Sequence, residues 1–277
     1  MSDLIVLLHG SANGSYSWGP VQSALVSRGA TVVAPDMLGY GNAPPPSERW
    51  SLAEETEHLQ CSVNHAHNGT VHLVAHSLGA TFGFYLLRAL GLRVTRMTLI
   101  DPVIVSVLRE TGENDGYAEM EAQYHRFMGL LADPTAAARA FVEHWSGVGS
   151  WERIGEKARV VITALVPKIR LEMIAARSDT TALQALVKSP PPTTILVGER
   201  TRIAPRAVAG QLARAFDAST IVVPGAGHMI PLTHAAVVVD AVLAAEASAE
   251  AGTSTTTERW REHGKARWEG SPCYRGQ

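Results

Sequence analysis

Short apolar segments rich in valine, isoleucine and leucine alternate along most of this chain with longer segments of helical periodicity. The apolar segments are residues 4–8, 31–34, 71–75, 97–100, 194–197 and 220–223. The helical segments that lie between them are residues 18–28, 51–66, 78–90 and 205–216. Continuous apolar strands are typical of parallel sheets whose two faces are covered by helices. The sequence therefore predicts an α/β fold with a doubly wound, mostly parallel sheet.

One interval interrupts this alternation. About ninety residues separate the apolar segment that ends at Ile100 from the one that begins at Thr194, which is far longer than an ordinary strand connection. Four helical segments fall within it, at residues 117–131, 135–144, 158–176 and 181–187. The interval ends in Ser189 followed by three prolines, a stiff connector back to the sheet. We predict an inserted helical cap that lies over one edge of the sheet.

The domain organisation follows from these segments. Residues 1–101 and 191–245 are expected to form the sheet core, and residues 102–190 the helical cap or lid. Residues 246–277 are expected to form a loosely ordered C-terminal tail, because a threonine-rich stretch at 252–257 reads as a linker.

Charge and hydropathy exclude some classes of function and location. Only 18% of the residues are charged and the net charge is -2, which argues against a nucleic-acid partner. The N-terminus lacks the basic region of a signal peptide, and the longest apolar stretch is too short to span a bilayer. We therefore expect a cytoplasmic protein without a membrane span that acts on a small molecule. Its oligomeric state is not predictable from the sequence.

The strongest local pattern is the segment 71–79, Val-His-Leu-Val-Ala-His-Ser-Leu-Gly. A strand is followed by a sharp turn with Ser77 at its apex, and then by a helix that opens with the small residues Gly79 and Ala80. Small neighbours let the backbone pass close to itself, so the serine hydroxyl stands exposed above the sheet. A serine that merely caps a helix is the alternative for this segment taken alone.

A histidine follows the last predicted strand on a glycine-rich loop, 223–232, and is the best candidate base among eleven histidines. This residue, His228, lies 151 positions after Ser77 in the chain (228 minus 77). A neutral imidazole can take a hydroxyl proton near pH 7 and return it to a leaving group. Ser77 and His228 together predict nucleophilic catalysis.

The serine segment resembles the nucleophile elbow of the α/β-hydrolase family, with Ala75 in place of the family's first glycine. The segments Leu8-His9-Gly10-Ser11 and Asp36-Met37-Leu38-Gly39-Tyr40-Gly41 also match the family, in its order. The resemblance covers about residues 4–245. It implies that the backbone N–H groups of Ser11 and Leu78 form an oxyanion hole.

The acid of the catalytic triad departs from the family pattern. Family members commonly place an aspartate or glutamate in the loop after the penultimate strand, where this chain has Thr201. Two carboxylates are candidates: Asp101, at the end of the strand before the cap, and Glu199, near Thr201. We favour Asp101 because its strand end directs it to the same crevice and Pro102 fixes the backbone beyond it. A cap-anchoring role for Asp101 is the alternative.

These residues predict a serine hydrolase of the carboxylesterase type (EC 3.1.1), which cleaves an ester-like bond of a small apolar substrate through an acyl-enzyme. Dehalogenase and epoxide hydrolase activities are disfavoured, because such relatives need an aspartate where Ser77 stands. Three alternatives remain open: a carbon–carbon bond hydrolase acting on a diketone, a lactonase, and a non-catalytic ligand-binding protein. No cofactor is expected, since Gly39-x-Gly41 lacks the third glycine of a dinucleotide motif. No metal is expected either, because His65, His67 and His72 lack metal-ligand spacing.

Overall fold

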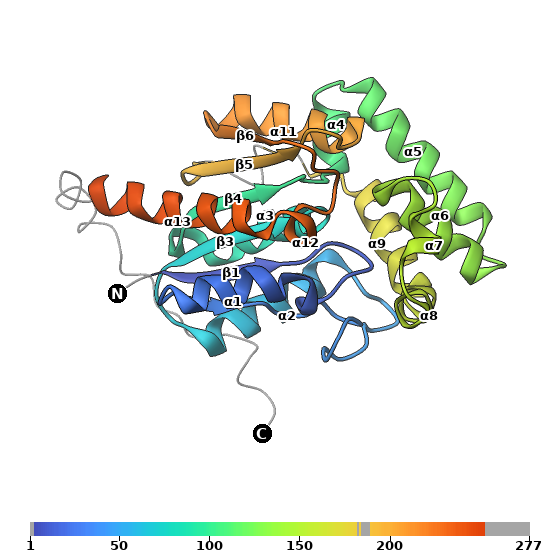
Figure 1. The fold of residues 1–277 in the computed structure, drawn as a ribbon, viewed down its shortest axis with the longest axis horizontal. Helices are drawn as coiled ribbons and strands as arrows, with labels where there is room; N and C mark the ends of the chain where they lie inside the picture. The colour runs from blue at the N-terminus through green and yellow to red at the C-terminus, as the bar shows by residue number, and fades with distance from the viewer. Residues whose placement is uncertain (1–2, 182, 184–188, 253–277) are drawn as a thin grey trace.

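The computed structural model describes residues 3–181, 183 and 189–252 of the chain (Figure 1). Six strands form one sheet in the order β2-β1-β3-β4-β5-β6, and every pair is parallel. The strands are β1 (Leu4–Leu8), β2 (Thr31–Val33), β3 (Val71–His76), β4 (Val94–Ile100), β5 (Thr193–Gly198) and β6 (Ser219–Val223). The predicted fold class is confirmed.

Helices cover both faces of the sheet because successive strand side chains point to opposite sides. In β1, Ile5 and Leu7 pack in one apolar cluster, with α1 (Gly19–Ser27) and α13 (Ala235–Gly252). Val6 and Leu8 belong to a second cluster, which includes residues of α2 (Leu52–Ala66), α3 (Gly79–Leu90) and α11 (Ile203–Phe216). Short helical turns η1 (Ser15–Trp18), η2 (Gly91–Arg93) and α12 (Ile230–Thr233) complete these connections.

Further helices lie between β4 and β5, and Figure 1 shows most of them gathered at one end of the sheet. They are α4 (Val105–Glu110), α5 (Asn114–Gly129), α6 (Pro134–Ser146), α7 (Ser150–Arg153), α8 (Glu156–Ala164) and α9 (Val166–Ser178). Phe127, Phe141 and Ile169 belong to an apolar cluster formed mainly by these helices. The carboxyl ends of the parallel strands point toward this group, so a site built there lies under it.

The connection between β4 and β5 differs from the prediction in two ways. The single helix predicted over 158–176 is two helices, α8 and α9, which meet at Leu165. Pro167 has no N–H to give to a carbonyl four residues earlier, so the first helix cannot continue through it. The short helices α4 and α7 were not predicted, because six and four residues carry too little periodicity. Most of the helix predicted at 181–187 lies outside the described residues.

The end of the chain also differs from the prediction. The last helix of the described residues, α13, runs beyond Ala245, where the predicted core ends, to Gly252, since alanine-rich sequence favours helix. Within it, Glu246 pairs with His72 of β3 at 3.1 Å, so this position is held against the sheet. Residues 253–277, where most of the tail was predicted, lie outside the described residues. Among the helices that the structure describes, none is long and apolar enough to cross a membrane.

Candidate active site

Ser77 lies in a strained turn between β3 and α3. Its φ angle is +57°, in the left-handed region that a residue with a side chain rarely adopts. Two glycines make this turn possible. A Cβ on Gly79 would lie 2.6 Å from the carbonyl oxygens of Leu8 and His9, and a Cβ on Gly10 would lie 2.8 Å from the Ser77 Cβ. The loop after β1 therefore passes directly beside the serine, and neither glycine can be replaced without moving backbone or Ser77.

The structure brings Ser77, His228 and Asp101 together from three separate strand ends. The His228 Nε2 lies 2.9 Å from the Ser77 Oγ, and its Nδ1 lies 3.3 Å from an Asp101 carboxylate oxygen. All three residues are buried. The Trp145 ring from α6 stacks on the imidazole with 4.4 Å between ring centroids. A nucleophile, a base and an acid that orients the base are arranged in this way in serine hydrolases.

Besides His228, two further residues hold the Asp101 carboxylate in place. One carboxylate oxygen accepts the N–H of Gly198 at 3.0 Å, and the other accepts the hydroxyl of Thr201 at 2.6 Å. The alternative acid, Glu199, does not join this group, because its carboxylate accepts the N–H of Gly225 at 2.7 Å on the exposed side of the loop. Thr201, which the sequence presented as the departure from the family pattern, thus supports the carboxylate that directly follows β4.

His76 fixes the backbone of the loop that carries His228. Its Nε2 donates a hydrogen bond to the His228 carbonyl oxygen at 2.8 Å. Burial, together with the nearby His228 ring, lowers the pKa of His76 to about 3. The His76 ring is therefore neutral, with its proton on Nε2, and acts as a hydrogen-bond donor. Sequence reasoning missed this role, although His76 directly precedes the serine.

The loop that carries Ser11 is held in place by a buried carboxylate of α9. Ser11 and Leu78 both line the cavity at Ser77. The Ser11 hydroxyl donates to Glu172 at 2.6 Å. The Tyr40 hydroxyl also donates to Glu172, at 2.7 Å, and accepts the N–H of Ala12 at 3.2 Å. Ala12 has a φ angle of +59°, so these bonds retain the loop in a strained shape.

Comparison with known proteins gives the family. Residues 5–241 match the profile of the Alpha/beta hydrolase family. The chain belongs to this family. A segment of 103 residues, 35% of this chain, is 30% identical to the probable lysophospholipase BODYGUARD 3 of Arabidopsis thaliana and covers 21% of that protein. The chain spans between about a fifth and about three fifths of the length of the first curated relatives that it matches.

Solved structures of the α/β-hydrolase family show the same fold. The bromoperoxidase of Bacillus anthracis superimposes with a TM-score of 0.70 at 22% identity, over 88% of this chain and 91% of that one. Haloalkane dehalogenase DbeA of Bradyrhizobium elkani superimposes with a TM-score of 0.65 at 18% identity, over 91% and 92% of the two chains. Similarity at this level of identity establishes the fold of the chain and not its substrate.

Glu172 belongs to a buried ionic network that joins α9 to the core of this α/β hydrolase. The Lys168 Nζ lies 2.8 Å from Glu55 and 3.6 Å from Glu172, and it stands over the Trp50 ring at 3.7 Å. Burial raises the pKa of Glu172, although Lys168 opposes that shift. Sequence reasoning missed the network. Its only local signal was the pair Lys168 and Glu172, four residues apart on a predicted helix.

Replacing Lys168 with methionine is expected to lower the free energy of unfolding by about 3–5 kcal/mol, because two buried carboxylates lose their cation. Urea unfolding at pH 7 measures this loss. Lys157→Met, at an exposed position on α8, is the matched control and should change stability by less than about 0.5 kcal/mol. Adding Glu55→Gln to Lys168→Met should recover part of the loss. Equal stabilities for the two lysine variants would contradict a contribution of this ionic network to the free energy of unfolding.

Two histidines, the buried His76 and the partly buried His144, are expected to make stability depend on pH. Burial lowers the pKa of His76 and of His144 to about 3 in the folded protein, from 6.5 in the unfolded chain. Between pH 6.5 and 3 the unfolded chain therefore binds more protons, and stability that is complete above pH 6.5 falls as the pH falls. For His76 we expect a loss of about 2 kcal/mol between pH 7 and pH 5.

Urea unfolding of two phenylalanine variants at pH 7 and pH 5 tests this dependence. His144→Phe should lose less stability than the wild type between the two pH values, because one buried titrating group is gone. His65→Phe, at an exposed helix end, should follow the wild type. Identical pH dependence in the wild type and His144→Phe would contradict the assignment of a neutral, partly buried His144.

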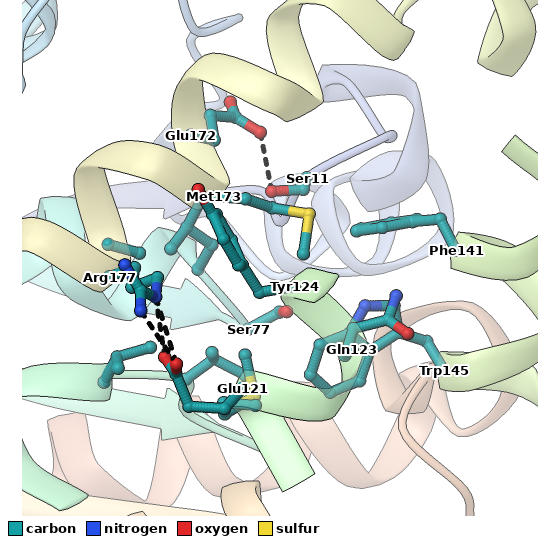
Figure 2. A pocket seen from close by; sticks show the side chains of 15 residues that line it. Ser11, Ser77, Glu121, Gln123, Tyr124, Phe141, Trp145, Glu172, Met173 and Arg177 are labelled. Carbon is teal, nitrogen blue, oxygen red and sulfur yellow. Dashed lines mark hydrogen bonds and ion pairs between the residues drawn. The ribbon is translucent and has the colours of Figure 1, made fainter. Parts of the chain in front are cut away.

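Two cavities meet at Ser77, and both are also lined by Ser11, Phe141 and Trp145. The smaller has a volume of about 40 Å³ and lies against α4, α5 and α9. Figure 2 shows the Ser77 hydroxyl in this cavity, with the Glu172–Ser11 hydrogen bond and the Arg177–Glu121 ion pair on its walls. The larger has a volume of about 320 Å³ and lies between α6, α8 and α12. Among the described residues, no cluster of His, Cys, Asp and Glu is placed to hold a metal ion.

Proposed function

We propose that this α/β hydrolase is a serine hydrolase that cleaves an ester-like bond of a small apolar substrate. The observation that carries the proposal is the hydrogen-bonded series from Ser77 through His228 to Asp101, with distances of 2.9 and 3.3 Å. A serine hydroxyl is a weak nucleophile by itself, and a base within hydrogen-bond distance activates it. Asp101 orients the imidazole and stabilises its protonated form.

The proposed reaction has two halves. The Ser77 Oγ attacks the ester carbonyl carbon while His228 Nε2 takes its proton, and the N–H groups of Ser11 and Leu78 stabilise the oxyanion. The carbon–oxygen bond to the alcohol then breaks, and His228 gives its proton to that alcohol. Water next attacks the acyl-enzyme, His228 again takes and returns a proton, and the carboxylic acid leaves as Ser77 is regenerated.

The substrate class follows from the walls of the cavities. We propose that residues 102–190 act as a cap over Ser77, which supplies apolar side chains such as Phe141, Trp145 and Met173 to the site. An uncharged, apolar ester suits such walls better than a phosphorylated compound. We do not extend to this chain the dehalogenase activity named for a structural neighbour, because a serine and not an aspartate stands at the nucleophile position.

Two measurements on the wild-type protein test the proposal. A fluorophosphonate probe should label Ser77 covalently, as shown by mass spectrometry of the modified peptide. In parallel, p-nitrophenyl esters, lactones and diketones should be assayed side by side, and the esters should show the highest kcat/KM. Labelling without ester turnover would favour the lactonase or carbon–carbon bond hydrolase alternatives. Neither labelling nor turnover would favour a ligand-binding protein.

A further inference from the structure

The base of the proposed triad contacts only one of the two cavities that meet at Ser77. His228 lines the larger cavity, together with its neighbour Met229, and is not among the residues that line the smaller one. Phe141 and Trp145 line both cavities. Because Trp145 also stacks on the His228 ring, it covers one face of the imidazole. The site therefore has two chemically different sides.

The direction of proton transfer assigns a role to each side. After attack by Ser77, the His228 Nε2 must give its proton to the oxygen of the leaving alcohol, which requires that oxygen to lie next to the imidazole. The leaving alcohol therefore belongs in the cavity that His228 lines, and the acyl group belongs in the other cavity.

We propose that the preferred substrate is an ester of a short acid with a long, apolar alcohol. This inference rests on the proposed serine hydrolase function. The alcohol side has a volume of about 320 Å³, and apolar side chains on its walls include Val142, Ile154, Ile162 and Leu232. The acyl side has a volume of only about 40 Å³, and Val103, Val105, Met120 and Met173 are among the residues that limit it.

Two groups on the acyl side add a polar feature to this short pocket. Gln123 of α5 is buried, and its amide nitrogen has no hydrogen-bond partner among the described residues. Glu172, on the other wall, is buried and bound to Ser11. A buried donor without a partner costs free energy that a ligand acceptor recovers. A short acyl group that carries a second oxygen is therefore expected to fit this side better than a purely hydrocarbon one of the same length.

A pair of isomeric esters separates the two sides of the site. Hexyl acetate and methyl heptanoate have the same formula, and both release a primary alcohol, but one is long on the alcohol side and the other on the acyl side. We expect kcat/KM for hexyl acetate to exceed that for methyl heptanoate by about tenfold or more, as a pocket that excludes several methylenes allows. Both rates are measured in a pH-stat, which titrates the carboxylic acid as it is released.

Variants of the two cavities test the same assignment independently. Met173→Ala should enlarge the acyl side and raise kcat/KM for methyl heptanoate about fivefold or more relative to hexyl acetate. Ile162→Trp should fill the alcohol side and lower kcat/KM for hexyl acetate, while kcat/KM for methyl heptanoate should change little. The matched controls are Met128→Ala, which truncates the same residue type, and Val160→Trp, which introduces the same tryptophan; both positions line neither cavity.

The outcomes distinguish this inference from the proposed function. If methyl heptanoate is hydrolysed as fast as hexyl acetate or faster, the assignment of the two cavities is wrong while the serine hydrolase function stands. If neither ester is hydrolysed although the fluorophosphonate probe labels Ser77, the proposed substrate class is wrong. If neither ester turns over and Ser77 is not labelled, the proposed function itself fails.

Discussion

Replacement of Ser77 by alanine is expected to lower kcat for ester hydrolysis by about five to six orders of magnitude, because no other atom replaces the nucleophile. The Oγ makes the covalent bond of the acyl-enzyme, so its loss removes that route and leaves only the contributions of the oxyanion hole and substrate binding. Burst-phase and steady-state kinetics with a p-nitrophenyl ester measure the effect. KM should change much less than kcat, since the hydroxyl contributes little to ground-state binding.

Ser106→Ala provides the matched control for this variant. Ser106 is a buried serine of α4 that lines neither cavity at Ser77. Its replacement should leave kcat within about twofold of the wild type and should leave labelling by the fluorophosphonate probe intact. Ser77→Ala should also keep the backbone of the turn in place, because the hydrogen bond from the N–H of residue 77 to the Ile100 carbonyl does not involve the side chain. Retention of a few per cent of wild-type kcat by Ser77→Ala would contradict a serine nucleophile.

The positions of Ser77 and His228 were predictable because each is marked by its own local segment. Small residues around Ser77 are needed where two backbones approach within contact distance, and Gly10 and Gly79 occur in the sequence for that reason. His228 follows the last strand on a glycine-rich loop. The ends of parallel strands meet at one edge of a sheet, so the fold alone brings such residues together.

The supporting residues were not predictable because their partners are far away in the sequence. Lys168 and Glu55 are separated by 113 positions, and Tyr40 and Glu172 by 132. Neither partner has a periodicity or a motif that points to the other. The sheet and its flanking helices depend on local patterns, whereas this network depends on how α9 packs on the core, which no local pattern encodes.

Thr201 shows how a residue read in isolation can mislead. In the sequence, Thr201 stands at the family's usual position for the acid, where it cannot carry a negative charge. In the folded chain its hydroxyl donates to the Asp101 carboxylate at 2.6 Å, at the end of a neighbouring strand. If Asp101 is the acid, as we propose, the residue at the family's usual acid position supplies a supporting hydrogen bond instead.

The identity of the acid is tested by a matched pair of variants. Asp101→Asn is expected to lower kcat by about ten thousandfold, because an amide neither stabilises the protonated imidazole nor holds the correct tautomer. Glu199→Gln should change kcat by no more than about twofold, because Glu199 lies on the exposed side of its loop and contacts Gly225. Both replacements are nearly isosteric and each removes one carboxylate. The comparison of the two kcat values therefore shows which of the two carboxylates is needed for activity.

The asparagine variant is expected to fold, which keeps the kinetic result interpretable. Its side-chain carbonyl can still accept the N–H of Gly198, which now binds an Asp101 oxygen at 3.0 Å. Its amide nitrogen would then face both His228 and Thr201, because the other Asp101 oxygen contacts both residues, and an N–H in that place favours the wrong imidazole tautomer. Labelling by the fluorophosphonate probe should slow in parallel with kcat, since both reactions need the activated Ser77. A large loss of kcat in Glu199→Gln with little change in Asp101→Asn would move the acid to the loop after β5 and would reduce Asp101 to an anchor of that loop.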